Sequence, residues 1–277
     1  MSRERVLERR LRTLSTLEES VAALRALSAQ HFRTAREPLA SVRRYREEVE
    51  RFRSVLDGPF AATSSGPPGI VLITADLGLV GEYTARLVRE ALDLRGAIGP
   101  GPIVCLGHRA VSHLARAGVV PESVDRSPSS IGALTTVLLP LVDTLLELRR
   151  GGRMGDLWLV AARFEGAGGY TPRRVQVLPV APGDATAGLA PSPWCGRAAL
   201  NAVVVRELLY AALYETLVEA LASEHGKRLV TAEAARSWLA SRIAELRRQV
   251  ASLRRETSTQ EVLEVVAASR ATRGAVS

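Results

Sequence analysis

The sequence predicts a mixed α/β fold, in which long N- and C-terminal helices pair as an antiparallel coiled coil with an α/β domain between them. Three observations support this prediction. Residues 2–56 contain no glycine and a single proline, residues 69–193 alternate strand-like and helix-like patterns, and after Gly196 the chain has no proline and one glycine up to Ser269. Uninterrupted stretches favour long helices, and alternation favours a layered domain. We therefore expect segments at residues 1–57, 69–193 and 194–277.

The N-terminal segment carries one apolar stripe, and only Pro38 interrupts the run. Its apolar side chains recur at spacings of four and three, which places them on one face of a helix: Leu7, Leu11, Leu14, Leu17, Val21, Leu24 and Leu27. A similar seam in the C-terminal segment consists of Leu239, Ile243, Leu246, Val250 and Leu253. Such a seam needs a partner helix, and the N-terminal helix is the nearest one.

The middle segment reads as alternating strands and helices. Apolar runs predict strands at 70–75, 103–106, 157–164 and 174–180, and helical patterns predict helices at 80–94, 109–117 and 131–149. This alternation favours a mainly parallel sheet. Turn-rich stretches at 57–69 and 181–193 predict a boundary and a surface loop.

The stretch GIVLITADLGLVGEYTARLVREAL, residues 69–92, resembles a phosphate-binding junction of strand, glycine turn and helix. A Walker-type loop needs a lysine after its second glycine, but the only lysine of this chain is Lys227. The dinucleotide pattern is also unmet, because Gly78 and Gly81 lack a third glycine at the helix start. We therefore interpret these glycines as a tight structural turn.

Composition and charge narrow the classes of partner. The formal net charge is +8 and the isoelectric point is near 10.4, which is compatible with nucleic acid, an anionic membrane surface or an acidic protein. Acidic residues are interspersed with the arginines, so we do not expect nucleic acid binding. The N-terminus is charged throughout and no window approaches the length of apolar residues that a membrane helix needs. We expect a membrane link only through partner proteins.

No group of residues suggests catalysis, a cofactor or a metal. Cys105 and Cys195 make no metal spacing and read as incidental thiols in a reducing compartment. His108 and His113 lack neighbouring carboxylates or thiols, and His31 and His225 lie in the helical arms. Neither a nucleophile elbow nor a pair of carboxylates in an apolar setting is present.

The end of the chain, RRETSTQEVLEVVAASRAT, suggests a partner-binding tip. Thr257, Thr259, Gln260 and Glu261 form a polar patch on a helix, and an apolar group follows at once: Val262, Leu263, Val265 and Val266. An apolar tip on a helix that has passed the end of its partner must be buried in another protein.

Three short stretches carry a family resemblance. They are DLGLVG at 76–81, VEALASEHGKRLV at 218–230, and TQE at 259–261 followed by VLEV. They resemble, in turn, the loop motif Asp-Arg-Gly-Leu-Cys-Gly, the stretch Glu-Asn-Leu-Ala-Ser-Glu-x-x-x-Arg-Met and the tail Ile-Thr-Gln-Glu-x-x-Glu-Ile of the γ subunits of F-type ATP synthases. The layout is similar over nearly the whole chain, with a Rossmann-like α/β domain between two long helices.

The sequence also departs from that family. The family helix patterns Thr-x-Lys-Ile-Thr-x-Ala-Met and Val-Ala-Ala-x-Lys correspond here to LEESVAAL at 17–24 and LSAQH at 27–31, so expected basic residues are absent. Leu77 and Val80 replace the arginine and cysteine of the loop motif. These departures indicate a divergent member, and the alternative N-type F-ATPases of some bacteria are one setting for such a chain.

The resemblance implies a central rotor shaft with no catalytic activity of its own. Such a shaft couples ion flow through the membrane c-ring to ATP synthesis or hydrolysis in the α3β3 ring, and its partners are the α, β and ε subunits and the c-ring. It implies a peripheral location at the cytoplasmic face of the bacterial inner membrane. The residues that match the family's contacts with the α3β3 ring are Arg228, Arg255, Thr259, Gln260, Glu261, Val262 and Val266.

Two other interpretations stay open from the residues alone. A coiled-coil scaffold or adaptor with an α/β head would use the same arms for self-association. A nucleotide-using enzyme with helical arms would bind nucleotide in isolation. Co-purifying chains, oligomeric state and nucleotide binding distinguish the three.

Overall fold

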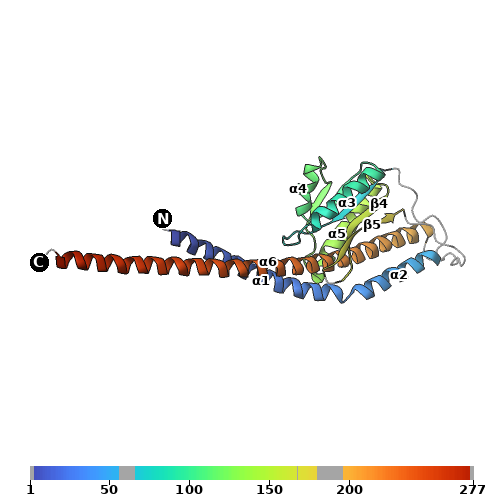
Figure 1. Cartoon of the computed structure of the whole chain (residues 1–277). Helices are drawn as coiled ribbons and strands as arrows, with labels where there is room; N and C mark the ends of the chain where they lie inside the picture. Colours follow the sequence, from blue (N-terminus) through green and yellow to red (C-terminus); the bar gives the residue numbers. More distant parts are fainter. Residues whose placement is uncertain (1–2, 56–65, 167, 180–195, 275–277) are drawn as a thin grey trace. The chain divides into compact units, whose positions relative to one another are not determined.

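The structure, a computed structural model, describes residues 3–55, 66–166, 168–179 and 196–274. Six α-helices, one 3-10 helix and five strands follow one another along these residues (Figure 1). The elements are α1 (Arg3–Arg36), α2 (Leu39–Val55), β1 (Gly69–Ile73), α3 (Tyr83–Ile98), β2 (Ile103–Leu106), α4 (Arg109–Arg116), β3 (Ser123–Asp125), η1 (Ile131–Ala133), α5 (Leu134–Arg150), β4 (Leu157–Phe164), β5 (Tyr170–Leu178) and α6 (Arg197–Gly274). The predicted α/β class with long terminal helices is confirmed.

The chain divides into two compact units. The coiled-coil unit is Met1–Ala26 with Ala232–Ser277, and the α/β unit is Leu27–Thr231. These limits differ from the expected segments, because much of the terminal helices belongs to the α/β core. Buried residues there come from the end of α1, from α2 and from the first half of α6: Ala35, Leu39, Val42, Leu209, Leu213 and Leu217.

The sheet of the α/β unit has the strand order β3-β2-β1-β4-β5. Strands β1 to β4 are parallel to their neighbours, and β5 is antiparallel to β4. The mainly parallel sheet is therefore confirmed, and β2 and β4 have the expected bounds. Strand β3 was not predicted, since three residues of mixed polarity give no pattern. The β5 strand begins four residues before the expected start because it pairs along the whole of β4.

Helices cover both faces of this sheet. On one face, Ile70 and Leu72 of β1 pack with α3 and α4, and on the other, Val71 and Ile73 pack with α5 and α6. Because both faces are buried, the strand reads as a continuous apolar run rather than an alternating one. The Rossmann-like arrangement places the loops after β1, β2 and β3 at one edge of the sheet, where parallel strands end together.

The stretch Ile131–Arg150 is long and apolar enough, by length and composition, to cross a membrane, with a mean hydropathy of 1.7. It comprises η1 and α5. One stripe of it is buried in the α/β core: Leu134, Leu138, Leu141, Val142, Leu145 and Leu148. This packing accounts for its apolar composition as that of a core helix.

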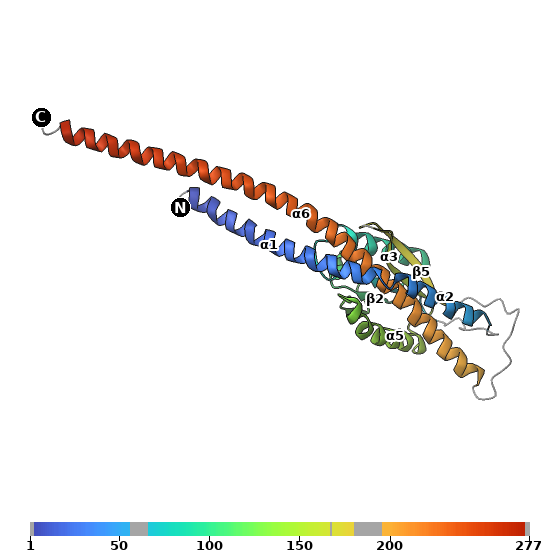
Figure 2. The same cartoon turned by 90° about the horizontal axis from the view of Figure 1, so that it is seen from below.

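In the coiled-coil unit, α1 and α6 run antiparallel (Figure 2). The seam residues of α6 are buried there: Leu239, Ile243, Leu246 and Val250. An ion pair joins Arg25 to Glu233, and Arg254 at the other end pairs with Glu4 and Glu8. Residue 25 of α1 thus lies beside residue 233 of α6, and the start of α1 lies beside residue 254. This order confirms the antiparallel pairing of the two helices.

Candidate functional site

The C-terminal part of α6 extends beyond the described residues of α1. The Arg254 Nε donates to Glu4 Oε1 at 2.9 Å, so α6 is already opposite the first turn of α1 at this point. The apolar side chains that follow are exposed: Val262 at 62%, Leu263 at 63% and Val265 at 69%. Within the coiled-coil unit these side chains have no helix to pack against among the described residues, so their apolar surface is available to another protein.

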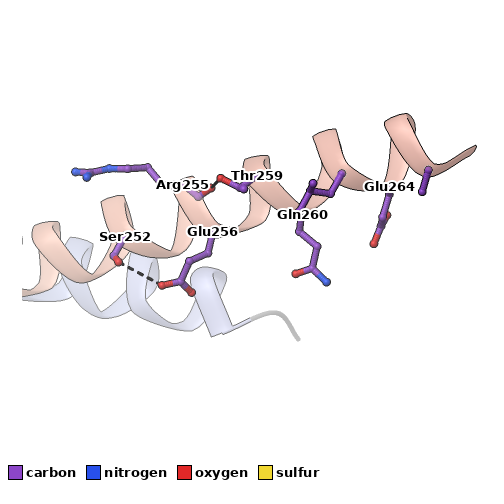
Figure 3. Close-up of a pocket in the computed structure, with 8 residues that line it drawn as sticks. Ser252, Arg255, Glu256, Thr259, Gln260 and Glu264 are labelled. Carbon is purple, nitrogen blue, oxygen red and sulfur yellow. Dashed lines mark hydrogen bonds between the residues drawn. The ribbon is translucent and has the colours of Figure 1, made fainter. Parts of the chain in front are cut away.

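One face of this tip carries a shallow hollow, and Figure 3 draws the residues that line it. A cavity of about 720 Å³ lies along α6 and is lined by Ser252, Arg255, Glu256, Thr259, Gln260, Leu263, Glu264 and Ala267. These residues recur at spacings of three and four, which places them on one face of the helix. The face presents a guanidinium, an amide and carboxylates beside an apolar side chain. This mixture is suited to binding another protein rather than to catalysing a reaction.

Two local hydrogen bonds order the polar side chains of this face. The Thr259 Oγ1 donates to the carbonyl oxygen of Arg255 at 2.8 Å, and the Ser252 Oγ donates to Glu256 Oε1 at 3.4 Å (Figure 3). The Arg255 and Gln260 side chains reach outward from the helix in the same view. Six of the seven residues expected to contact the ring therefore lie on the tip, and three of them line its hollow: Arg255, Thr259 and Gln260.

Arg228 is not part of this group. It lies in the α/β unit, it is 1% exposed, and its guanidinium already binds within that unit. Its Nε donates to the carbonyl oxygen of Gly78 at 3.1 Å, its Nη2 to that of Leu77 at 3.4 Å, and it pairs with Glu224. In this structure the Arg228 guanidinium is buried among acceptors of its own unit, and its expected contact with the ring stays a prediction.

The polar groups of the loop after β1 make structural hydrogen bonds. The Asp76 carboxylate accepts the backbone N–H groups of His108 at 2.8 Å and of Ser127 at 2.7 Å, and so joins the loops after three strands. Leu79 and Gly81 both have φ at 57°, in the left-handed region. These bonds account for the loop as the expected structural turn. Among the described residues, no group of three His, Cys, Asp or Glu side chains is placed to hold a metal ion.

Buried titratable groups surround this loop. Burial, and next the charge of Arg228, lower the pKa of His225 to about 4. Burial raises the pKa of Glu224, although its pairing with Arg228 opposes that shift. Burial also raises the pKa of the Cys105 thiol to about 12, so this cysteine stays protonated and unreactive at neutral pH. Cys195 lies outside the described residues.

The sequence did not reveal the ion pairs between the two helices of the coiled-coil unit. Arg254 pairs with Glu4 and Glu8, and Arg25 pairs with Glu233. Each helix alone shows mixed charge, and only the antiparallel register brings these partners together. Aligning the two heptad seams in opposite directions would have found them.

These features define a class of protein: an antiparallel pair of long helices and an α/β unit, with an exposed apolar tip available to other chains. The family model described as ATP synthase matches residues 3–272. The chain therefore belongs to the ATP synthase γ family, whose members form the non-catalytic central rotor stalk while catalysis occurs in the β subunits. The resemblance read from the three motifs is confirmed, and the scaffold and enzyme interpretations are set aside.

Curated relatives and solved structures agree with this family. The chain is 28% identical over 285 residues to the ATP synthase gamma chain of Moorella thermoacetica, covering 96% of this chain and 98% of the relative. It is 26% identical over 294 residues to that of Symbiobacterium thermophilum, covering 98% and 99%. A chain of the Euglena gracilis mitochondrial ATP synthase OSCP/F1/c-ring structure has a TM-score of 0.69 at 14% identity, covering 97% of this chain and 94% of that one. A chain of the Tetrahymena thermophila central stalk/c-ring structure has a TM-score of 0.53 at 16% identity, covering 80% and 99%.

Proposed function

We propose that this chain is the rotor shaft of a bacterial F-type ATP synthase, at the cytoplasmic face of the inner membrane, coupling ion flow through a c-ring to ATP chemistry in an α3β3 ring. The observation that carries the proposal is the exposed apolar end of α6 beyond the described residues of α1. Membership of the γ family supports the class of assembly. The contacts with each partner and the cellular location are our inference.

The apolar side chains of the tip suit rotation inside an apolar sleeve. Val262, Leu263, Val265 and Val266 are exposed at 41% to 69%. Contacts between apolar surfaces are non-directional, so their free energy changes little as one surface turns against the other. A tip of this kind would hold the shaft on its axis without selecting one angle.

The polar residues of the tip would set preferred angles. We assign Arg255, Thr259, Gln260 and Glu261 to hydrogen bonds with loops of the surrounding ring. Bonds that involve a charged group contribute about 1.5 to 3 kcal/mol each, which biases an orientation and still allows the bond to break in every turn. Each orientation would favour a different β conformation only through its differential contact energy.

The α/β unit would carry the other partners. We assign to it the ε subunit and the c-ring, so that the chain meets the membrane only through other subunits. The assemblies named for similar structures, OSCP/F1/c-ring and central stalk/c-ring, support this assignment.

Co-purification from the native host tests the proposal. The tagged chain is isolated in mild detergent, and the chains that accompany it are identified and quantified by mass spectrometry. We expect α, β, ε and c subunits in fixed ratios, with the c-subunit sequence deciding between protons and sodium ions. A homodimer without these subunits would contradict the proposal and restore the scaffold interpretation.

A further inference from the structure

Residues 224–231 of α6 contact four other parts of the α/β unit. These are α1 at Phe32, the β1–α3 loop at residues 77–81, the β3–η1 loop at Ser129 and the β4–β5 turn at Gly168. We call this arrangement the collar. All of its residues belong to the α/β unit, and α6 continues from it into Ala232 of the coiled-coil unit without interruption.

Arg228 is the centre of the collar. Its guanidinium donates to two carbonyl oxygens of the β1–α3 loop, those of Leu77 and Gly78, and it pairs with Glu224 one turn earlier on α6. The Arg228 Nη1 lies 3.2 Å from the Nδ1 of His225. A planar guanidinium holds such a set of acceptors in one geometry, which a lysine ammonium cannot do. These hydrogen bonds attach α6 to the loop that follows β1.

His225 attaches α6 to a second loop. Its Nε2 lies 3.1 Å from the carbonyl oxygen of Ser129. Because that oxygen only accepts, Nε2 carries the proton and Nδ1 is left to accept from Arg228, which assigns the neutral tautomer. The His31 ring of α1 stands edge-on to the His225 ring at 4.9 Å between centroids. One side chain thus contacts α1, Arg228 and the β3–η1 loop.

Glycines bring two further backbones against α6. A Cβ on Gly226 would lie 3.0 Å from Phe32 Cε2 and 3.4 Å from the Cα of Gly168. A Cβ on Gly168, where φ is +82°, would lie 2.6 Å from Val230 Cγ2. A Cβ on Gly81 would lie 3.6 Å from Lys227 Cε and 3.9 Å from Thr231 Oγ1. The β4–β5 turn and the β1–α3 loop therefore touch the helix at close range.

The order of these contacts along α6 has a geometric consequence. Successive residues of an α-helix point about 100° apart around its axis. His225, Gly226, Lys227 and Arg228 are four successive residues, and each meets a different element or a different part of a loop. Together they cover roughly 300° of the circumference. Rotation of α6 about its own axis relative to the sheet would break several of these contacts at once.

We propose that the collar is the joint through which torque passes between the α/β unit and α6, with Arg228 as its positioning residue. This inference rests on the proposed rotor function and deepens it. A helix held on one side could roll or slide under load, whereas a helix held by several elements at different angles around its axis turns with the unit to which they belong. The Arg228–Glu224 ion pair is buried, so solvent and salt weaken its attraction less than they would weaken that of an exposed pair.

The test uses the whole membrane complex with the double variant Arg228→Met and Glu224→Gln, which removes the charged pair without leaving one charge unpaired. The matched control is Arg236→Met, an exposed arginine two turns further along α6. ATP hydrolysis by the detached α3β3γ complex needs the tip but no load on the α/β unit. ATP-driven ion pumping and ion-driven ATP synthesis in vesicles need both.

We expect hydrolysis by the detached complex to persist in the double variant, while coupled pumping and synthesis fall by about two- to thirtyfold, the range for residues along a coupling network. Hydrolysis and coupling that fall together would overturn the proposal in favour of a purely structural or ring-contact role, and unchanged coupling would also overturn it. The rotor function itself is tested separately, because its failure would show as a wild-type chain that does not assemble with α and β at all.

A cross-link gives a second test, and its arm in the wild-type collar does not depend on how well the double variant folds. Cysteines at Gly81 and Thr231, in a Cys195→Ser background, are close enough in the structure to join α6 to the β1–α3 loop. We expect the oxidised cross-link to leave coupling intact in the wild-type collar and to restore it in the double variant, with reductant reversing the rescue. Loss of coupling on oxidation of the wild-type collar would show that the joint must move, which contradicts the proposal.

Discussion

The tip and the collar lie on the same helix but use polar side chains in opposite ways. At the tip, Arg255 and Glu261 are exposed, and Thr259 between them bonds to a backbone carbonyl of α6 itself. In the collar, Arg228 is buried and bonds to a loop far away in sequence, and the buried Glu224 pairs with it. Exposed polar groups are free to exchange one partner for another, whereas buried ones hold a single arrangement. Under the proposed rotor function, α6 would slide against its partners at the tip and stay fixed in the collar.

The largest expected effect concerns the tip. Replacing Val262, Leu263, Val265 and Val266 with serine should abolish stable assembly with an α3β3 ring, because each buried apolar side chain contributes about 1.5 to 3 kcal/mol. The melting temperature of the isolated chain should stay unchanged, because these side chains are exposed. Assembly is measured by size-exclusion chromatography and melting by circular dichroism. Normal assembly of the quadruple variant would show that the ring does not bind the apolar side chains of the tip, which contradicts the role given to the tip in this comparison.

Arginine substitutions at the two sites sharpen the comparison. Arg228→Ala should lower the free energy of unfolding by about 3 to 5 kcal/mol, since it leaves the Glu224 carboxylate buried and unpaired. Arg255→Ala, on the exposed tip, should change it by about 0.5 kcal/mol or less. Urea denaturation of the two purified variants gives both values. Equal changes in the free energy of unfolding would mean that the buried Arg228 contributes no more to stability than the exposed Arg255.

The pH dependence of stability should come from the collar rather than from the tip. The pKa of His225 is lowered to about 4, so the unfolded chain binds this proton at a higher pH than the folded chain does. The stabilisation is complete above about pH 6.5, the ordinary histidine value, and is lost as the pH falls towards 4, at about 1.4 kcal/mol per unit of pKa shift.

Several groups face His225 and modify this slope. They are Arg228 and Glu224 on its own helix, His31 from α1 and the Ser129 carbonyl from the β3–η1 loop. The raised pKa of Glu224 acts in the opposite direction, because the folded chain then binds that proton more readily. Unfolding curves of the wild type and of His225→Gln between pH 4 and 7 give the contribution of His225 to the pH dependence of stability. His113→Gln is the control. A slope that survives in His225→Gln would assign the effect elsewhere.

The smallest effect should differ in sign between two helical glycines. Gly226→Ala should destabilise the chain by about 1 to 3 kcal/mol, because the added methyl group meets Phe32 at 3.0 Å in a packed collar. Gly96→Ala in α3 should stabilise it by about 0.4 to 1 kcal/mol, since nothing lies within 4 Å of the added group. Thermal melts of both variants decide the matter, and a stabilising Gly226→Ala would mean that the collar is loosely packed.

Periodicity predicted much of this fold, because the apolar side chains that make the pattern are the ones that pack. The seam of Leu239, Ile243, Leu246 and Val250 required a partner helix, and the structure buries it against α1. Strand β1 was visible as an apolar run because both of its faces are covered. By contrast, β3 has three residues and depends on pairing with β2, which no local pattern encodes.

The site was predictable only in part, for a related reason. The exposed tip follows from the order of residues along one helix, so the sequence was enough to locate it. The burial of Arg228 depends on Leu77 and Gly78, which are about 150 positions away along the chain and meet it only in the folded unit. An arginine in a charged helix gives no sign of such partners, so the motif alone could not locate them.

Lys227 is the only lysine among the 277 residues, and it lies in the collar. A lysine-specific protease therefore has one cleavage site in the whole chain, and the α-helix around that site must unwind before the bond can enter an active site. The rate of cleavage after Lys227 reports directly how often the collar opens, without any label or substitution. A shaft turning under load could be compared by this means with one at rest, and an increase in cutting would reveal the joint yielding.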